Sequence, residues 1–137
     1  MAALFKLEIV TPERQFYSGQ VEALIVDTPD GERGIYANHV PMIIALDVGR
    51  ISIKDNQEWK SFFASEGFVE IRKNETIIMA QAVETQDEID VRRAEEAKRK
   101  AEERLRQRQS LQEYHTTMSS LARAMARLRV KKSENID

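Results

Sequence analysis

Charged side chains in the C-terminal third of the sequence have a spacing that could hold a phosphate-bearing ligand. Asp90 and Arg93 are three residues apart, and Lys100 follows Arg93 by seven, so all three share one face of a helix. Arg123 and Arg127 are four residues apart and share a face of a second helical segment. Because a planar guanidinium group can donate two parallel hydrogen bonds to phosphate oxygens, several such groups from two helices could neutralise a triphosphate.

The sequence offers no comparable arrangement for catalysis. Its two histidines, His39 and His115, lie in different halves of the chain and fit no metal-ligand spacing. The absence of cysteine excludes disulfides, thiolate metal sites and a cysteine nucleophile. Nothing resembles a phosphate-binding loop, and the stretch 31–34 is better explained as a turn. We therefore expect a protein that is not an enzyme and has no catalytic or metal-binding residues.

Charge is distributed unevenly along the chain, although the net charge is only −2. Residues 1–86 carry 8 basic and 13 acidic residues, whereas residues 87–137 carry 13 basic and 10 acidic ones. This asymmetry indicates an acidic partner for the tail, which could be a protein, a nucleotide or a nucleic acid. No apolar run approaches the ~18 residues that span a bilayer, and the N-terminus lacks a secretory signal, so we expect a soluble, cytoplasmic chain without direct membrane insertion.

Residues 1–86 show the two-residue period of β-strands, interrupted by turn residues. Phe5, Leu7 and Ile9 alternate with polar neighbours, and turn sequences occur at 28–31 and 73–74. The other β-rich runs are 21–26, 50–54, 59–63, 68–72 and 76–80. Short strands at this spacing predict an antiparallel sandwich or barrel.

Residues 87–137 contain neither Gly nor Pro and place apolar residues at helical spacing. Thr85 and Glu88 fit a capping box, with Asp87 as a rival N-cap, and a joint between two helices is expected at 107–110. The first helix has a narrow apolar stripe, and the second has a seam in alternating steps of four and three. The stripe is Ala94, Ala97, Ala101 and Leu105, and the seam is Tyr114, Met118, Leu121, Met125 and Leu128.

These two patterns predict an α+β chain with two domains. Residues 1–86 form an antiparallel β-sandwich or barrel, and residues 87–137 form an antiparallel two-helix hairpin. Because alanine buries little apolar surface, such a hairpin needs the sandwich, a ligand or another protein to hold it. A weakly held element is easily switched between states.

Several local patterns follow one another over nearly the whole chain. They are Thr11-Pro12, Gly31-Glu32-x-Gly34-Ile35, His39-x-Pro41, Gly67-Phe68-Val69-Glu70-Ile71, Ala80-Gln81-Ala82, Ile89-Asp90-x-x-Arg93-Ala94 and Arg123-Ala124-Met125-x-Arg127-Leu128. In this order they resemble the epsilon subunit of bacterial F-type ATP synthases. The resemblance implies a ten-stranded sandwich, a two-helix C-terminal domain and a non-catalytic role in the central stalk of a proton- or sodium-translocating rotary motor.

The resemblance also implies partners and a location. The sandwich would meet the gamma subunit and the ring of c subunits, at the cytoplasmic face of the membrane. The tail would act as a brake on ATP hydrolysis when it extends toward the alpha and beta subunits. An extended basic helix suits acidic surfaces on beta, which could engage Arg92, Arg99, Arg104, Arg106, Arg108 and Arg129. The alternative is a solvated helix face with pairs such as Glu95–Arg99 and Glu102–Arg106.

Some bacterial family members bind ATP through Ile/Leu-Asp-x-x-Arg-Ala, which Ile89, Asp90, Arg93 and Ala94 match without a gap. The resemblance therefore implies a regulatory, non-hydrolysed ATP at the hairpin, with the Mg²⁺ requirement left open. Its implied site is Glu84, Ile89, Asp90, Arg93, Ala94, Lys100, Arg123 and Arg127. Glu84 and Asp90 would accept hydrogen bonds from the adenine amino group or the ribose, with Ile89 against the ring.

Two features limit this nucleotide interpretation. Lys100 stands where strong ATP binders of the family have arginine, and because lysine lacks the bidentate fork we expect a lower affinity. Arg123 and Arg127 project roughly opposite the apolar seam, so the seam must face the sandwich or another surface if these arginines face the first helix. A purely structural alternative is an Asp90–Arg93 ion pair favoured by the helix dipole.

A binding adaptor from another class is the main rival. Its basic hairpin would grip nucleic acid or a coiled-coil partner. The tail, however, intersperses 10 acidic residues among its 13 basic ones, and Tyr114 is its only aromatic residue. Base stacking therefore has little to use, and we expect no nucleic-acid partner.

Overall fold

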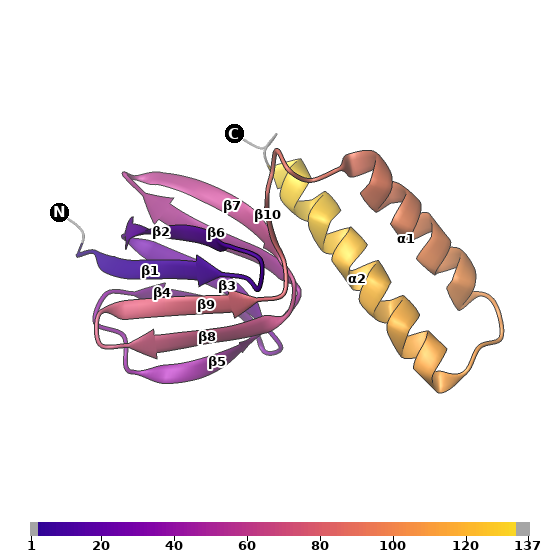
Figure 1. The fold of residues 1–137 in the computed structure, drawn as a ribbon, viewed down its shortest axis with the longest axis horizontal. Coiled ribbons are helices and arrows are strands. Elements are labelled where there is room, and N and C mark those ends of the chain that lie inside the picture. The colour runs from indigo at the N-terminus through magenta and orange to yellow at the C-terminus, as the bar shows by residue number, and fades with distance from the viewer. Residues whose placement is uncertain (1–2, 134–137) are drawn as a thin grey trace.

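The computed structural model describes residues 3–133, which form a β-sandwich with a helical hairpin beside it (Figure 1). Residues 134–137 of the predicted tail domain lie outside the described residues. The strands are β1 (Phe5–Val10), β2 (Gln15–Val21), β3 (Ala23–Thr28), β4 (Gly31–Tyr36), β5 (Met42–Leu46), β6 (Gly49–Asp55), β7 (Glu58–Ala64), β8 (Gly67–Arg72), β9 (Glu75–Ala80) and β10 (Val83–Thr85). The helices are α1 (Val91–Leu105) and α2 (Leu111–Ser133). The predicted α+β class and the order of its two parts are confirmed.

The sandwich consists of two five-stranded sheets. One has the order β2-β1-β9-β8-β5 and the other has the order β10-β7-β6-β3-β4. Among the described strands, every pair is antiparallel except β1 and β9, which run in parallel with Lys6 opposite Glu75. β1 lies between its hairpin partner β2 and β9, a strand from much later in the chain.

The core lies between the two sheets and follows the alternation seen in the sequence. Phe5, Leu7 and Ile9 are almost fully buried, while Lys6 and Glu8 on the opposite face form an ion pair. Two predicted turns have the backbone that their residues favour. Gly31 has a φ of 117° next to the β3–β4 turn, and Asn74 has a φ of 56° between β8 and β9.

The predicted start of the first helix is wrong by several residues. The capping-box hydrogen bonds do form, since the Glu88 N–H donates to Thr85 Oγ1 and the Thr85 N–H donates to Glu88 Oε1. They close a turn ahead of the helix, because Thr85 is still extended and pairs with Phe62 of β7. The N-cap is Asp90, not Thr85 or Asp87, and Asp90 Oδ1 accepts from the Arg93 N–H at 3.1 Å.

The joint between the helices lies at the predicted place. α1 ends at Leu105, and Ser110 Oγ accepts from the Glu113 N–H at 3.1 Å to cap α2. Among the described residues, no helix combines the length and the apolar character needed to cross a membrane.

The apolar seam of α2 does not form the packing surface of the hairpin. Ala94 and Ala101 of the α1 stripe are buried, but Tyr114, Met118 and Met125 of the seam are exposed. The remaining seam residues, Leu121 and Leu128, are half-buried. The buried residues of α2 are instead Thr117, Ala124, Ala126 and Val130. These buried residues are mostly small, which allows the two helices to approach closely on that face of α2. The N-terminal end of α2 also points away from the sandwich (Figure 1), so the sandwich does not cover the seam there.

The hairpin meets the sandwich through the C-terminal half of α2. We call the buried set Phe63, Ile89, Ala126 and Val130 the junction cluster; it is separate from the main core. Polar contacts surround it: the Gln86 side chain donates to the Val130 carbonyl, and Lys131 Nζ donates to the Gln86 carbonyl at 2.8 Å. Arg129 pairs with Asp27 of β3 at 3.3 Å.

Shortening Val130 should loosen the hairpin without disturbing the sandwich. The Val130→Ala substitution removes two buried methyl groups from the junction cluster and should cost about 1–2 kcal/mol of docking free energy. Amide hydrogen exchange in α2 should then be about tenfold faster, while exchange in β1 and β9 is unchanged. Met125→Ala, on an exposed face of the same helix, is the matched control and should change neither. Equal exchange rates in both variants would contradict the assignment of this cluster as the anchor.

Candidate functional site

A cavity of about 470 Å³ lies between the two helices and the segment that joins β10 to α1. This volume is within the ~300–1,000 Å³ typical of small-molecule sites. Its lining contains six of the eight predicted site residues: Glu84, Asp90, Arg93, Ala94, Arg123 and Arg127. Glu88, Ala97 and Ser120 complete the lining. The two helices therefore bring together charged groups that lie up to 43 residues apart in the sequence.

The helical periods account for this gathering. Arg93, Ala94 and Ala97 lie on one face of α1, and Arg123 and Arg127 lie on one face of α2. Both arginines line the cavity next to α1, and the seam, which such a placement would turn toward the sandwich or another surface, is largely exposed. The small side chains of Ala94 and Ala97 leave the space that a larger residue would fill.

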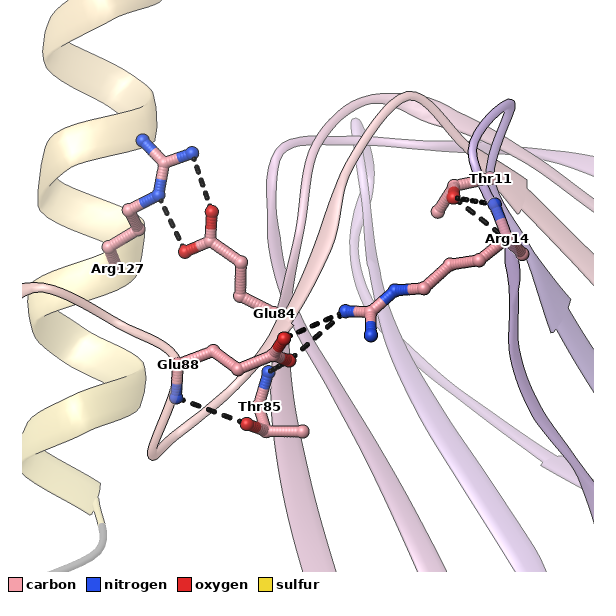
Figure 2. Close-up of polar contacts among 6 residues, drawn as sticks. All are labelled: Thr11, Arg14, Glu84, Thr85, Glu88 and Arg127. Carbon is pink, nitrogen blue, oxygen red and sulfur yellow. Dashed lines mark hydrogen bonds and ion pairs between the residues drawn. The ribbon is translucent and has the colours of Figure 1, made fainter.

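Arg127 is the most firmly held guanidinium group of the cavity. It makes a bidentate pair with Glu84, Nε to Oε1 at 3.0 Å and Nη2 to Oε2 at 3.1 Å (Figure 2). Its guanidinium carbon also lies 4.4 Å from the centroid of the Phe63 ring, a cation–π contact. The two residues that contact Arg127, Glu84 of β10 and Phe63 of β7, are opposite each other on paired strands.

The other two guanidinium groups are less engaged. Arg123 makes a long contact of 3.4 Å to Ser120 Oγ. Within residues 3–133 the Arg93 side chain makes no ion pair, and the alternative Asp90–Arg93 salt bridge is replaced by the N-cap contact to the Arg93 backbone. Arg93 is exposed and belongs to the cavity lining, so in this part of the chain no ion pair occupies its donors.

Glu88 is a site residue that the sequence reasoning placed in a capping box and not in the cavity. Arg14, in the β1–β2 turn, donates to both of its carboxylate oxygens at 2.9 and 3.2 Å, and the Thr85 N–H donates to Oε1 at 3.0 Å (Figure 2). The backbone hydrogen bond from Thr85, with a further contribution from Arg14, lowers the pKa of the Glu88 carboxyl below its ordinary value. Glu88 thus ties the first turn of the sandwich to the base of the hairpin.

Two predicted residues lie elsewhere. Ile89 is 5% exposed and packs in the junction cluster, so in this conformation its side chain is not available to a ligand ring. Lys100 lines a neighbouring interhelical cavity of about 640 Å³ and pairs with Glu96 at 3.4 Å. Ala97 and Ser120 line both cavities, so the two hollows adjoin along the hairpin.

The donor set of the cavity suits a ligand with both phosphate and neutral polar groups. Three guanidinium groups match phosphate oxygens, and the carboxylates of Glu84, Glu88 and Asp90 match hydroxyl or amino donors. Equal numbers of both signs mean that the lining does not neutralise a triphosphate unless ion pairs rearrange. Ser120 carried no signal in the sequence, because a lone serine on a helix is common on solvated faces.

The remaining tail arginines have mixed surroundings. Arg99 pairs with Glu103 and Arg104 with Glu113, and Arg129 binds Asp27 of the sandwich. The expected helix pairs Glu95–Arg99 and Glu102–Arg106 are not among the ion pairs of residues 3–133. No ion pair of Arg92, Arg106 or Arg108 occurs within the same residues, which leaves three basic groups on the outer surface.

Comparison with known families accounts for both parts of the chain. Residues 4–86 match the beta-sandwich domain of the ATP synthase delta/epsilon chain, and residues 87–132 match its long alpha-helix domain. An ATP synthase epsilon chain from Caldanaerobacter subterraneus subsp. tengcongensis is 43% identical over 131 residues, covering 95% of each chain. Another from Ruminiclostridium cellulolyticum is 42% identical and covers 92% of this chain and 94% of its own.

Solved structures share the fold at much lower identity. A chain of the Euglena gracilis mitochondrial ATP synthase, OSCP/F1/c-ring in rotational state 1, has a TM-score of 0.82 and 16% identity, covering 100% of this chain and 84% of that one. A chain of the Tetrahymena thermophila mitochondrial ATP synthase, central stalk/c-ring, has a TM-score of 0.70 and 14% identity, covering 95% and 98%. At these identities the likeness shows the fold alone.

The Glu88 carboxyl should titrate below the usual range for glutamate in the folded chain. The ionised Glu88 carboxylate stabilises the folded chain at pH values above the pKa that Glu88 has in the unfolded chain. This stabilisation is lost as the pH falls through the lower pKa that Glu88 has in the folded chain. In Arg14→Gln the pKa should rise only part of the way, because the Thr85 backbone hydrogen bond, the larger cause, persists. Carboxyl carbon NMR measures this, with Arg72→Gln on β8 as the control that leaves Glu88 unchanged. An ordinary glutamate pKa in the unaltered chain would refute the assignment.

Proposed function

The chain belongs to the ATP synthase delta/epsilon chain family, and from that membership we propose that it is a non-catalytic rotor subunit in the central stalk of a bacterial F-type ATP synthase. Its sandwich docks on the gamma subunit and the c-ring, so the chain is peripheral at the cytoplasmic face of the membrane. The motor translocates protons or sodium ions. Supporting this role, relatives over 40% identical along nearly the whole chain are epsilon chains.

The outer face of the β5–β8–β9 sheet is suited to that docking. Phe68 and Met79 pair across β8 and β9 and are exposed, and Ile43 on β5 is 70% exposed. A cavity of about 740 Å³ adjoins them, with Phe68 and Met79 in its lining. Contiguous apolar surface of this kind is characteristic of protein–protein contacts.

The hairpin is proposed to be a mobile regulator that inhibits ATP hydrolysis. The observation that carries this proposal is the size of its anchor, four side chains at one end of α2 with a few polar contacts around them. α1 lies on the far side of α2 from the sandwich (Figure 1), so release of the anchor frees both helices together. Once extended, the basic residues Arg92, Arg106 and Arg108 are available to acidic surfaces of the alpha and beta subunits.

The hairpin cavity is proposed to bind ATP as a regulatory ligand that is not hydrolysed. Arg93, Arg123 and Arg127 bind phosphate oxygens, and Asp90 and Glu84 accept hydrogen bonds from adenine or ribose, with Ala94 against the ligand. Lys100 in the adjoining cavity adds a positive charge at longer range, while Ile89 supports the site from the junction cluster. Because ATP contacts both helices and β10, its binding favours the docked hairpin.

Deleting residues 88–137 should raise ATP hydrolysis by the assembled synthase, because the inhibitory element is lost. The Val130→Ala substitution should have the opposite effect, since a weaker anchor raises the extended population about tenfold. Steady-state hydrolysis by the reconstituted complex measures both, with Met125→Ala as the control. A rate of ATP hydrolysis that is unchanged by the deletion would refute the proposed inhibition by the hairpin.

The unaltered chain should bind ATP in isothermal titration calorimetry at concentrations up to millimolar. Replacing Arg93 and Arg127 together by alanine should weaken binding by about tenfold for each guanidinium group lost. Arg72→Ala removes an arginine far from the cavity and should leave the affinity unchanged. Failure of the unaltered chain to bind at millimolar ATP would end the nucleotide proposal.

A further inference from the structure

Glu84 occupies one of the two edges of the Arg127 guanidinium group that could bind a phosphate group, the edge formed by Nε and Nη2. Both of its oxygens accept from Arg127, at 3.0 Å from Nε and 3.1 Å from Nη2. A bidentate fork of this kind satisfies the donors on one edge of the guanidinium plane. A phosphate oxygen that approached the same edge would meet both an occupied donor pair and the negative charge of the carboxylate.

The surroundings identify Glu84 as the partner that moves. The Arg127 guanidinium lies over the Phe63 ring, and Phe63 is fully buried in the junction cluster. Glu84 lies on a three-residue strand at the edge of its sheet, and its side chain is 27% exposed, close to the 28% of Arg127, so the aromatic support of Arg127 is what distinguishes the two partners. Breaking the pair therefore leaves Arg127 supported by an aromatic ring, while the glutamate side chain can swing into solvent.

Building on the ATP site proposed above, we propose that Glu84 is a built-in competitor of the nucleotide: its carboxylate and the ligand's phosphate oxygens bind Arg127 in turn, never together. Glu84 thus sets the threshold nucleotide concentration at which the cavity fills. After the exchange the freed carboxylate can accept from a ribose hydroxyl or the adenine amino group, so one residue serves the empty and the filled states.

Glu88 provides a matched control for this exchange. It lines the same cavity and carries the same charge, but its carboxylate is held by Arg14 and the Thr85 N–H instead of by Arg127. Glu84→Gln and Glu88→Gln therefore change the net charge of the lining equally. Only Glu84→Gln releases the Arg127 fork.

Calorimetry on the full chain tests the exchange with ATP, inorganic triphosphate and adenosine as probes. Glu84→Gln should lower the Kd for ATP and triphosphate about three- to tenfold, more than Glu88→Gln does, and should not lower the Kd for adenosine, which has no phosphate and loses a charged acceptor. In an Arg127→Gln background the gain should vanish, because the contested group is gone. A gain in Glu84→Gln no larger than in Glu88→Gln, or one that persists without Arg127, would overturn the competition.

The outcomes separate this inference from the ATP site itself. ATP binding by the unaltered chain with no gain in Glu84→Gln refutes the competition and leaves the site standing. Binding by Glu84→Gln alone supports the competition and refutes a regulatory site in the unaltered chain. Absence of binding in every variant refutes both.

A second measurement avoids substitution in case Glu84→Gln releases the hairpin. In the unaltered chain, saturating ATP should shift the carboxyl carbon resonance of Glu84, which loses its Arg127 partner. The resonance of Glu88 should shift less, because Arg14 remains bound to it. A Glu84 resonance that does not move at saturation would contradict the exchange.

Discussion

The Phe63 ring joins the two parts of the chain. It belongs to β7 but is not part of the main core. It packs with Ala126 and Val130 of α2 and with Ile89 of the segment between β10 and α1. Its face carries the Arg127 guanidinium, and its strand partner is Glu84. Apolar docking and the position of the Arg127 guanidinium group therefore both depend on this aromatic side chain, and the backbone pairing of its strand places Glu84 beside them.

Because of this arrangement, the free energy that holds the hairpin against the sandwich is much smaller than the free energy that holds the sandwich together. The main core draws buried residues from both sheets, whereas the junction cluster has four members, two of them small or medium aliphatic residues. Ion pairs such as Glu84–Arg127 and Asp27–Arg129 are partly exposed and each contributes modestly in water. On the proposed function, a partner subunit can therefore supply the cost of releasing the docked hairpin while the sandwich stays intact.

The two-residue and helical periods were enough to predict an antiparallel sandwich or barrel, the hairpin and the joint near Ser110, because these depend on local burial, and the family resemblance selected the sandwich. The shared face of Asp90 and Arg93 and that of Arg123 and Arg127 could also be predicted from spacing, whereas the meeting of the two pairs in one site was implied by the family resemblance. The exposed seam of Tyr114, Met118 and Met125 could not, because the face of α2 that meets the sandwich is chosen by Phe63, far away in sequence. For the same reason no local pattern showed that Arg14 binds Glu88 or that Glu84 binds Arg127.

The parallel pairing of β1 with β9 has a consequence for how the chain is built. Lys6 and Glu75 are register neighbours although almost seventy residues separate them. Because such a long loop must close before that ladder forms, the pairing contributes a high contact order and is expected to form late. On the ribosome β1 can pair with β2 early, but the central ladder of its sheet must wait until β9 has left the exit tunnel. The hairpin docks on the other sheet, at Phe63 of β7, and β10, the last strand of that sheet, is made after β9 and just before the helices.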